Sequence, residues 1–253
     1  MKAAVFAGAV LLFVSTAVGA DVKETEEMTF DVNKGARISL ENINGDIRIT
    51  GGSGDEVRVT AHKKAGEQEY MDGLEIVVDA DDDYVRIETR HPKSEGHWYN
   101  FGHDGSGSVA YDLNVPADVN LDTITTINGD VTINGVSGMV KTETVNGSLE
   151  AEGLVSDANL ETVNGSVRAV FDFLGEGQRV SAEAVNGKIV LVLPADSSAR
   201  VNAETVNGSI KAGDFGLEPE KGFVGREMSG DIGGGHARIS LDTVNGSIHL
   251  TKK

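Results

Sequence analysis

Apolar and polar residues alternate along most of this chain with a period of two. In the segment 36–41, Ile38 and Leu40 are apolar and the residues around them are mostly polar, and segment 237–242 repeats the pattern almost unchanged. A period of two is typical of a β-strand with one buried face and one solvated face. Because the alternation recurs through residues 25–90 and again through 124–250, the sequence predicts an all-β protein.

A short phrase close to Thr-Val-Asn-Gly-Ser-Ile interrupts these strands at seven places. From Asn128 onward the successive Asn residues are 18, 18, 22, 21 and 38 residues apart. Asn-Gly is a strong signal for a tight turn, because both residues accept positive φ at little cost. A degenerate copy at residues 228–232 is predicted to fill the long last interval. The predicted repeat turns are Asn44, Gly45, Asn128, Gly129, Asn146, Gly147, Asn164, Gly165, Asn186, Gly187, Asn207, Gly208, Asn245 and Gly246.

Two architectures fit a unit of strand, corner and strand: an antiparallel hairpin meander and a parallel β-solenoid. The residue before the Asn is always aliphatic or Met, and in a hairpin it would lie on the polar face. A solenoid corner that bends inward would bury it. We therefore predict a parallel β-solenoid of about seven to eight coils of 16–22 residues with an irregular N-terminal β cap, and the meander is the alternative. The residues of this column are Ile43, Ile127, Val145, Val163, Val185, Val206, Met228 and Val244.

Stacked coils imply further structure at the corners and ends. The Asn side chains would form a ladder, each bonded to the next at the strand spacing of about 4.8 Å. Four apolar loop residues, Val136, Leu154, Phe173 and Phe215, are expected to add to the core. The similar segments 36–41 and 237–242 are expected to bracket the array.

The first 20 residues have the pattern of a secretory signal peptide. A single Lys precedes an apolar run, and small residues lead to a predicted cleavage after Ala20. The predicted divisions are the signal peptide 1–20, an N-terminal β region 21–114 with the first repeat and an aromatic insertion, and the Asn-Gly solenoid 115–253, continuous with 21–114. The expected location is periplasmic or secreted, without a membrane span in the mature protein.

Charge and composition narrow the possible partners. The formal net charge is −18, which argues against nucleic acid and anionic membranes as partners. The absence of Cys excludes disulfides and thiolate metal sites. The sequence carries no nucleophile elbow, phosphate loop or zinc motif, so no catalytic residue, cofactor or metal site is predicted.

Two groups of residues are candidates for binding. The stretch 91–104 departs most from the repeat, and its Trp98, Tyr99 and Phe101 could contact a ligand, although a disordered or simply packed hairpin tip is the alternative. An acidic residue lies three positions before most of the Asn residues, and stacking would bring these like charges within about 5 to 10 Å. A solvated face is the first interpretation of that acidic set, and weak divalent-cation binding is the second.

The run from Val115-Pro116-Ala117-Asp118 to Asn128-Gly129-Asp130-Val131, and its counterpart from Leu193-Pro194 to Ser209-Ile210, resemble a bacterial family. It is the putative adhesin family, extracytoplasmic proteins with recurring Asn-Gly-Ser/Asp-aliphatic coils and a domain of unknown function. The resemblance implies the solenoid architecture and provides no catalytic residues.

We therefore expect a non-enzymatic, adhesin-like protein that presents repeat β-sheet surfaces to a glycan or a cell-envelope protein. Two alternatives remain open. One is a β-helix carbohydrate-active enzyme, either a polysaccharide lyase or a hydrolase, and the other is an envelope-stress or assembly module.

Overall fold

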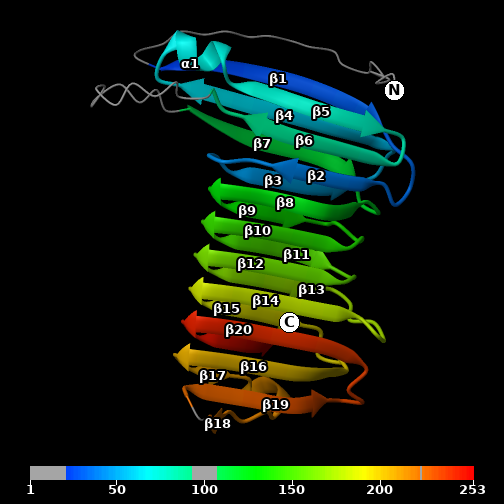
Figure 1. Ribbon diagram of the computed structural model, residues 1–253. Helices are drawn as coiled ribbons and strands as arrows, with labels where there is room; N and C mark the ends of the chain where they lie inside the picture. The colour runs from blue at the N-terminus through cyan, green and yellow to red at the C-terminus, as the bar shows by residue number, and fades with distance from the viewer. Residues whose placement is uncertain (1–20, 93–106, 223) are drawn as a thin grey trace, which may run out of the picture.

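Two long β-sheets face each other along the whole molecule, with the hydrophobic core between them (Figure 1). The structure, a computed structural model, describes residues 21–92, 107–222 and 224–253. In spatial order, one sheet, called sheet A, contains β1 (Val22–Asp31), β4 (Glu56–Ala65), β7 (Gly107–Pro116), β3 (Ile47–Gly52), β9 (Val131–Asn134), β11 (Leu149–Leu154), β13 (Val167–Phe171), β15 (Ile189–Leu193), β21 (Ile248–Lys252) and β17 (Ile210–Lys211).

The facing sheet, called sheet B, contains the other strand of each coil. In spatial order its strands are β18 (Glu220–Lys221), β19 (Arg226–Ile232), β16 (Ala199–Asn207), β20 (Ala237–Asn245), β14 (Arg179–Asn186), β12 (Ala158–Asn164), β10 (Val140–Asn146), β8 (Asn120–Asn128), β2 (Arg37–Glu41), β6 (Tyr84–Arg90) and β5 (Glu75–Asp81). The described helical segments are a short α-helix α1 (Gln68–Asp72) and a 3-10 turn η1 (Gly213–Phe215).

Each repeat forms one coil, with its first strand in sheet B, an Asn-Gly corner, and its second strand in sheet A. Neighbouring coils pair in parallel and in register, as β10 does with β12 and β11 with β13. The parallel β-solenoid is therefore confirmed, and the antiparallel meander is wrong for the repeats. Antiparallel pairing occurs at the ends of the stack, where β1, β4 and β7 form the N-terminal cap and β19 pairs with β16.

Inward-facing aliphatic side chains from both sheets fill the core. Ile38, Leu40 and Leu160 have no exposed surface, in keeping with the alternation of the strands. Of the four loop residues expected to join the core, Val136 and Leu154 are buried and Phe215 is partly buried against it.

Phe173 does not join the core, because 61% of its surface is exposed. The preceding aromatic residue, Phe171, ends strand β13 facing inward and is fully buried. Phe171 therefore occupies the position that the sequence pattern assigned to Phe173, and Phe173 lies in the loop that follows.

The order of coils in space differs from their order in the sequence. The coil of β2 and β3 lies between the strands β6 and β7 on one side and the coil of β8 and β9 on the other. The last coil in the sequence, β20 and β21, lies between β14–β15 and β16–β17 (Figure 1). The expectation that these two coils bracket the array is therefore wrong.

The segment 228–232 is not a degenerate coil. It belongs to β19, a single strand that runs antiparallel to β16 without a corner. Met228 and Ile232 are buried because they face the end of the core. The interval of 38 residues is long because the chain passes one coil position, forms this end cap, and then returns to fill the vacant position with β20 and β21.

Candidate binding surface

The corner Asn side chains form a continuous hydrogen-bonded ladder along the stack. In six of the seven, Nδ2 donates to the Oδ1 of the Asn in the neighbouring coil, at distances of 2.7–2.9 Å. The first member, Asn44, donates instead to the carbonyl oxygen of Gly107. The predicted ladder is thus confirmed, and it continues through the displaced last coil. In spatial order its members are Asn44, Asn128, Asn146, Asn164, Asn186, Asn245 and Asn207.

The corner glycines are required for a different reason from the one predicted. None of the Asn residues has positive φ, and of the corner glycines Gly45 alone does, at 125°. A Cβ on Gly165 would instead lie well under 3.0 Å from the carbonyl oxygen of Gly147 in the neighbouring coil. The Asn-Gly pairs therefore allow a close approach of stacked backbones rather than a left-handed turn.

The aliphatic residues before each Asn face solvent, so the prediction that they lie in the core is wrong. Val163 is 38% exposed and Val206 is 43% exposed, and only Met228, which is not at a corner, is buried. Strand alternation continues up to the corner, so the preceding Thr faces inward instead. Thr162 is buried and donates a hydrogen bond of 2.9 Å to the carbonyl oxygen of Gly147.

Side chains of one kind are brought into register on the outward face of sheet B. One set, the acidic column, runs across six adjacent strands through Glu143, Glu161, Glu183, Asp242, Glu204 and Glu227. A second set, the valine column, lies two residues further along each strand, about 6.7 Å away. The valine column consists of Val145, Val163, Val185, Val244 and Val206. A groove of about 380 Å³ follows these two columns.

A third set of aligned residues lies near the other end of the same strands. Arg179, Arg238 and Arg200 are adjacent in register, and a hollow of about 570 Å³ lies over them. Asp157 pairs with Arg179 at 3.1 Å, and Asp231 pairs with Arg200 at 2.9 Å. The hydrogen bond and charge of Arg200 lower the pKa of the Asp231 carboxyl. The arginines at both edges of this set are therefore already neutralised by the protein.

The structure places the predicted candidates differently. Trp98, Tyr99 and Phe101 lie outside the described residues. The predicted acidic set does stack, except for Glu41, which is separated from Glu143 by Thr125 of β8. Within residues 21–92, 107–222 and 224–253, no group of three His or acidic side chains has the geometry of a metal site.

Sequence reasoning missed the valine column as a surface feature. Its members were assigned to the core because they are aliphatic in every copy. The alternation itself gave the correct signal, since a Thr that recurs two residues before the Asn occupies the inward phase of the strand.

Parallel coils that stack in register, with their Asn-Gly corners aligned along one edge, define a class of β-solenoid. The model of the Toastrack DUF4097 family matches residues 103–251, and the chain belongs to this family. No curated protein matches the sequence.

Two solved structures that resemble this chain share little sequence with it. A "putative cell adhesion protein" from Clostridium sporogenes is 16% identical, with a TM-score of 0.51, and the match covers 90% of this chain and 100% of that one. A "putative adhesin" from Bacteroides fragilis is 15% identical, with a TM-score of 0.44 and coverage of 90% and 97%. The first of these likenesses supports the fold. In the parts of the chain that the structure describes, no helix is both long and apolar enough to cross a membrane.

Proposed function

We propose that this protein is an adhesin-like binding protein of the periplasm or cell exterior, which recognises a glycan or cell-envelope protein through the outward face of sheet B. The observation that carries the proposal is the register of the acidic and valine columns. Parallel stacking repeats one chemical group at about 4.8 Å intervals over several coils. Such a lattice suits an extended partner, which can contact several coils at once.

Several features favour recognition over catalysis. The groove over the two columns is lined mainly by repeated valines, threonines and carboxylates, with Ala184 and Arg226 among them. A glycosidase would need two carboxyl groups in distinct environments, so that one acts as an acid and the other as a base or nucleophile. The acidic column instead repeats one kind of side chain side by side along one flank of the groove. The names of the Clostridium and Bacteroides structures add support for a binding role.

The proposal is tested by capture from fractionated cell envelopes and on a glycan array. One variant removes three charges from the acidic column, Glu161→Gln, Glu183→Gln and Asp242→Asn. A matched control removes three charges from exposed loops on the opposite edge of the coils, Asp118→Asn, Glu176→Gln and Asp196→Asn. We expect the first variant to lose the captured ligand and the control to retain it. Equal capture by all three proteins, or reproducible cleavage of a polysaccharide, would contradict the proposal.

The proposed location has its own test. Expression of the full chain in a bacterial host, followed by mass spectrometry of the periplasmic fraction, should give a mature N-terminus at Asp21. Recovery of the uncleaved chain from the cytoplasm alone would contradict an extracytoplasmic location.

A further inference from the structure

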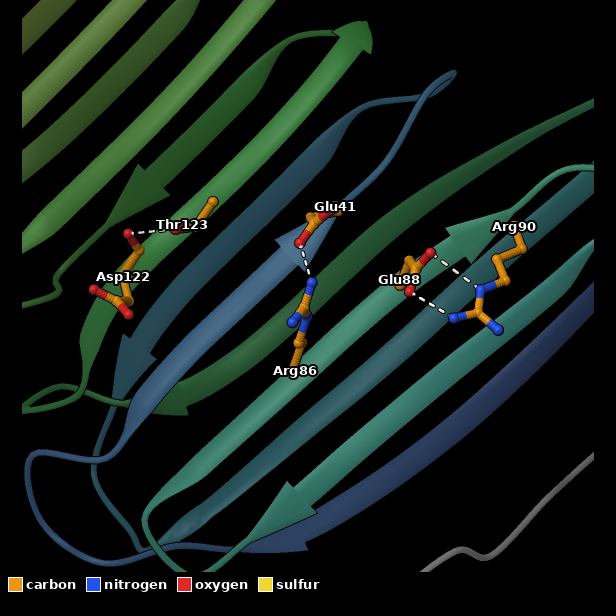
Figure 2. Close-up of polar contacts among 6 residues, drawn as sticks. All are labelled: Glu41, Arg86, Glu88, Arg90, Asp122 and Thr123. Atoms are coloured by element: carbon orange, nitrogen blue, oxygen red, sulfur yellow. Dashed lines mark hydrogen bonds and ion pairs between the residues drawn. The ribbon is translucent and has the colours of Figure 1, made fainter.

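In the described part of the chain, ion pairs neutralise one end of the line of outward-facing carboxylates in sheet B, whereas the other end forms none, although Arg226 borders the groove there. At the N-terminal end, Arg86 binds Glu41 at 2.8 Å and Arg90 binds Glu88 at 2.9 Å (Figure 2). Thr125 of β8 then interrupts the line. Beyond it, among the residues that the structure describes, none of the six members of the acidic column forms an ion pair.

The hydrogen bonds of the acidic column come from neutral groups. Asn159 donates to Glu161 at 2.7 Å, and Ser240 donates to Asp242 at 3.0 Å. These bonds orient the carboxylates without cancelling their charge. The loss of hydration, followed by the charges of Glu161 and Asp242, raises the pKa of the Glu183 carboxyl. A cation placed on this column would relieve that repulsion.

The valine column provides the apolar side of the same groove. Val163, Val185, Val244 and Val206 are each about two-fifths exposed, and the more exposed Val224 borders the same groove at 64%. The Asn ladder flanks the column on its other side, one residue further along each strand. A partner that lies on the valines therefore meets carboxylates along one flank and amides along the other.

The repeat distance distinguishes between possible shapes of the partner. Successive coils are about 4.8 Å apart, whereas same-side residues of an added strand would be about 6.7 Å apart. A polyproline helix repeats every 9 Å or so. An α-helix repeats every 5.4 Å or so, so along the five intervals from Glu143 to Glu227 it drifts by only about 3 Å, which flexible Lys and Arg side chains can absorb.

We propose that the groove between the acidic and valine columns binds a cationic amphipathic α-helix of a partner protein, with its axis along the stack. Its apolar stripe would lie on the valines and its Lys or Arg side chains on the carboxylates. This inference rests on the proposed function and specifies its partner. The net charge of −18 would also attract a cationic segment from a distance.

The test uses a helical peptide of about 16 residues, the length that spans the six strands of the acidic column. One face of the peptide carries Leu and the adjoining flank carries Lys, and its ends are acetylated and amidated. Binding is measured by fluorescence anisotropy and mapped through the methyl NMR signals of the valines. The probes for comparison are a scrambled isomer of the same composition and the small polycation spermine.

We expect the helical peptide to bind the wild-type protein and to shift the methyl signals of Val163, Val185 and Val244. The acidic-column variant described above should bind about tenfold more weakly, as expected for the loss of several exposed ion pairs. Val163→Thr, Val185→Thr and Val244→Thr together should also weaken binding. Val190→Thr with Val192→Thr, on the outward face of sheet A, and the loop-charge control should leave binding unchanged.

Equal binding of the scrambled isomer or of spermine would overturn the inference, because it would show that the groove attracts positive charge of any shape. Failure of the peptide to bind, while the wild-type protein still captures an envelope ligand that the acidic-column variant loses, would reject the helix and leave the proposed function standing. If the peptide does not bind and the wild-type protein captures no envelope ligand that the acidic-column variant loses, both the helical partner and the proposed function are rejected.

Discussion

The side-chain Nδ2 of Asn146 donates a hydrogen bond of 2.9 Å to the Oδ1 of Asn128, although the two residues belong to successive coils. Asn164 repeats the bond to Asn146 at the same distance. Each interior amide therefore acts both as a donor to one neighbour and as an acceptor from the other. The ladder stabilises the corner of the stack in addition to the backbone pairing of the strands.

Substitution within the ladder should cost more than substitution at its end. Asn164→Ala removes two side-chain hydrogen bonds, those to Asn146 and from Asn186, and should lower the free energy of unfolding by about 2 kcal/mol. Asn207→Ala removes only the bond to Asn245 and should cost about 1 kcal/mol. Urea titrations of the two variants make the comparison. Equal losses would contradict the expectation that an interior amide contributes twice as many ladder bonds as the terminal one.

Substitution of a stacked corner glycine should differ more strongly in stability from its control than the Asn substitutions do from each other. Gly165→Ala places a methyl group against the carbonyl of Gly147, and relief requires two coils to separate, so we expect a loss of about 3 kcal/mol. Gly52→Ala is the matched control, since no atom lies within 4 Å of the added methyl group and φ is not positive there. The control should be neutral or slightly stabilising, because Ala restricts the unfolded chain more than Gly. Thermal unfolding of both variants tests the prediction.

The sequence predicted the strands and corners well because stacking repeats one environment in every copy. Alternation placed Ile38 and Leu40 in the core, and the Asn repeat led to the ladder. The sequence did not reveal that Gly165 is required by the close approach of a neighbouring coil, because a close approach and a left-handed turn both favour Gly. Nor did it reveal the order of the coils, since β14 and β16 offer β20 equivalent edges.

The candidate surface was predicted less well than the fold. The acidic set was identified and does stack, but the valines beside it were assigned to the core. The sequence alone does not say whether a Val lies on the buried or the exposed face of a strand. In a short strand either face is possible until another residue identifies the inward one. Thr162, which is buried and bonded across coils, is the residue that fixes the phase.

A buried ion pair in the N-terminal cap provides a third prediction. Lys63 of β4 and Glu26 of β1 lie 2.6 Å apart, and their side chains are only 7% and 13% exposed. Lys63→Met should destabilise the protein by about 3 kcal/mol, because it leaves the carboxylate buried without a partner. Adding Glu26→Leu should restore most of the loss, since two apolar residues need no compensation. A double variant no more stable than Lys63→Met would contradict this account.

The acidic column should make stability depend on pH. The pKa of Glu183 is raised above its ordinary value of 4.5, chiefly by lost hydration and then by Glu161 and Asp242. Such a carboxyl binds protons more tightly in the folded chain than in the unfolded one, so its ionisation lowers stability as pH rises through the raised pKa. Glu183→Gln removes that effect.

At neutral pH the Glu183→Gln variant should therefore unfold at a higher urea concentration than the wild type. The difference should vanish below about pH 4, where the carboxyl is protonated in both states. High salt should reduce the difference at neutral pH by screening the column. Glu176→Gln removes one charge from an exposed loop and serves as the control. A midpoint for Glu183→Gln that is equal to or below that of the wild type at neutral pH would contradict the prediction.

The displaced last coil leads to a prediction about truncation. Strands β20 and β21 connect the coil of β14 and β15 to the coil of β16 and β17. Removing residues 237–253 would therefore leave a gap at the next-to-last coil of the stack rather than shorten the stack from its end. Because β17 pairs only with β21 among the described strands, it would lose its entire sheet pairing.

Hydrogen exchange of the truncated protein should show unprotected amides in β16 and β19 and protected amides in β10 and β12. A synthetic peptide of residues 237–253 added in trans should restore protection in β16, because it supplies the edge that β16 normally pairs with. Protection of β16 without the peptide would contradict the prediction, because β16 would then be held by β19 alone or would pair directly with β14.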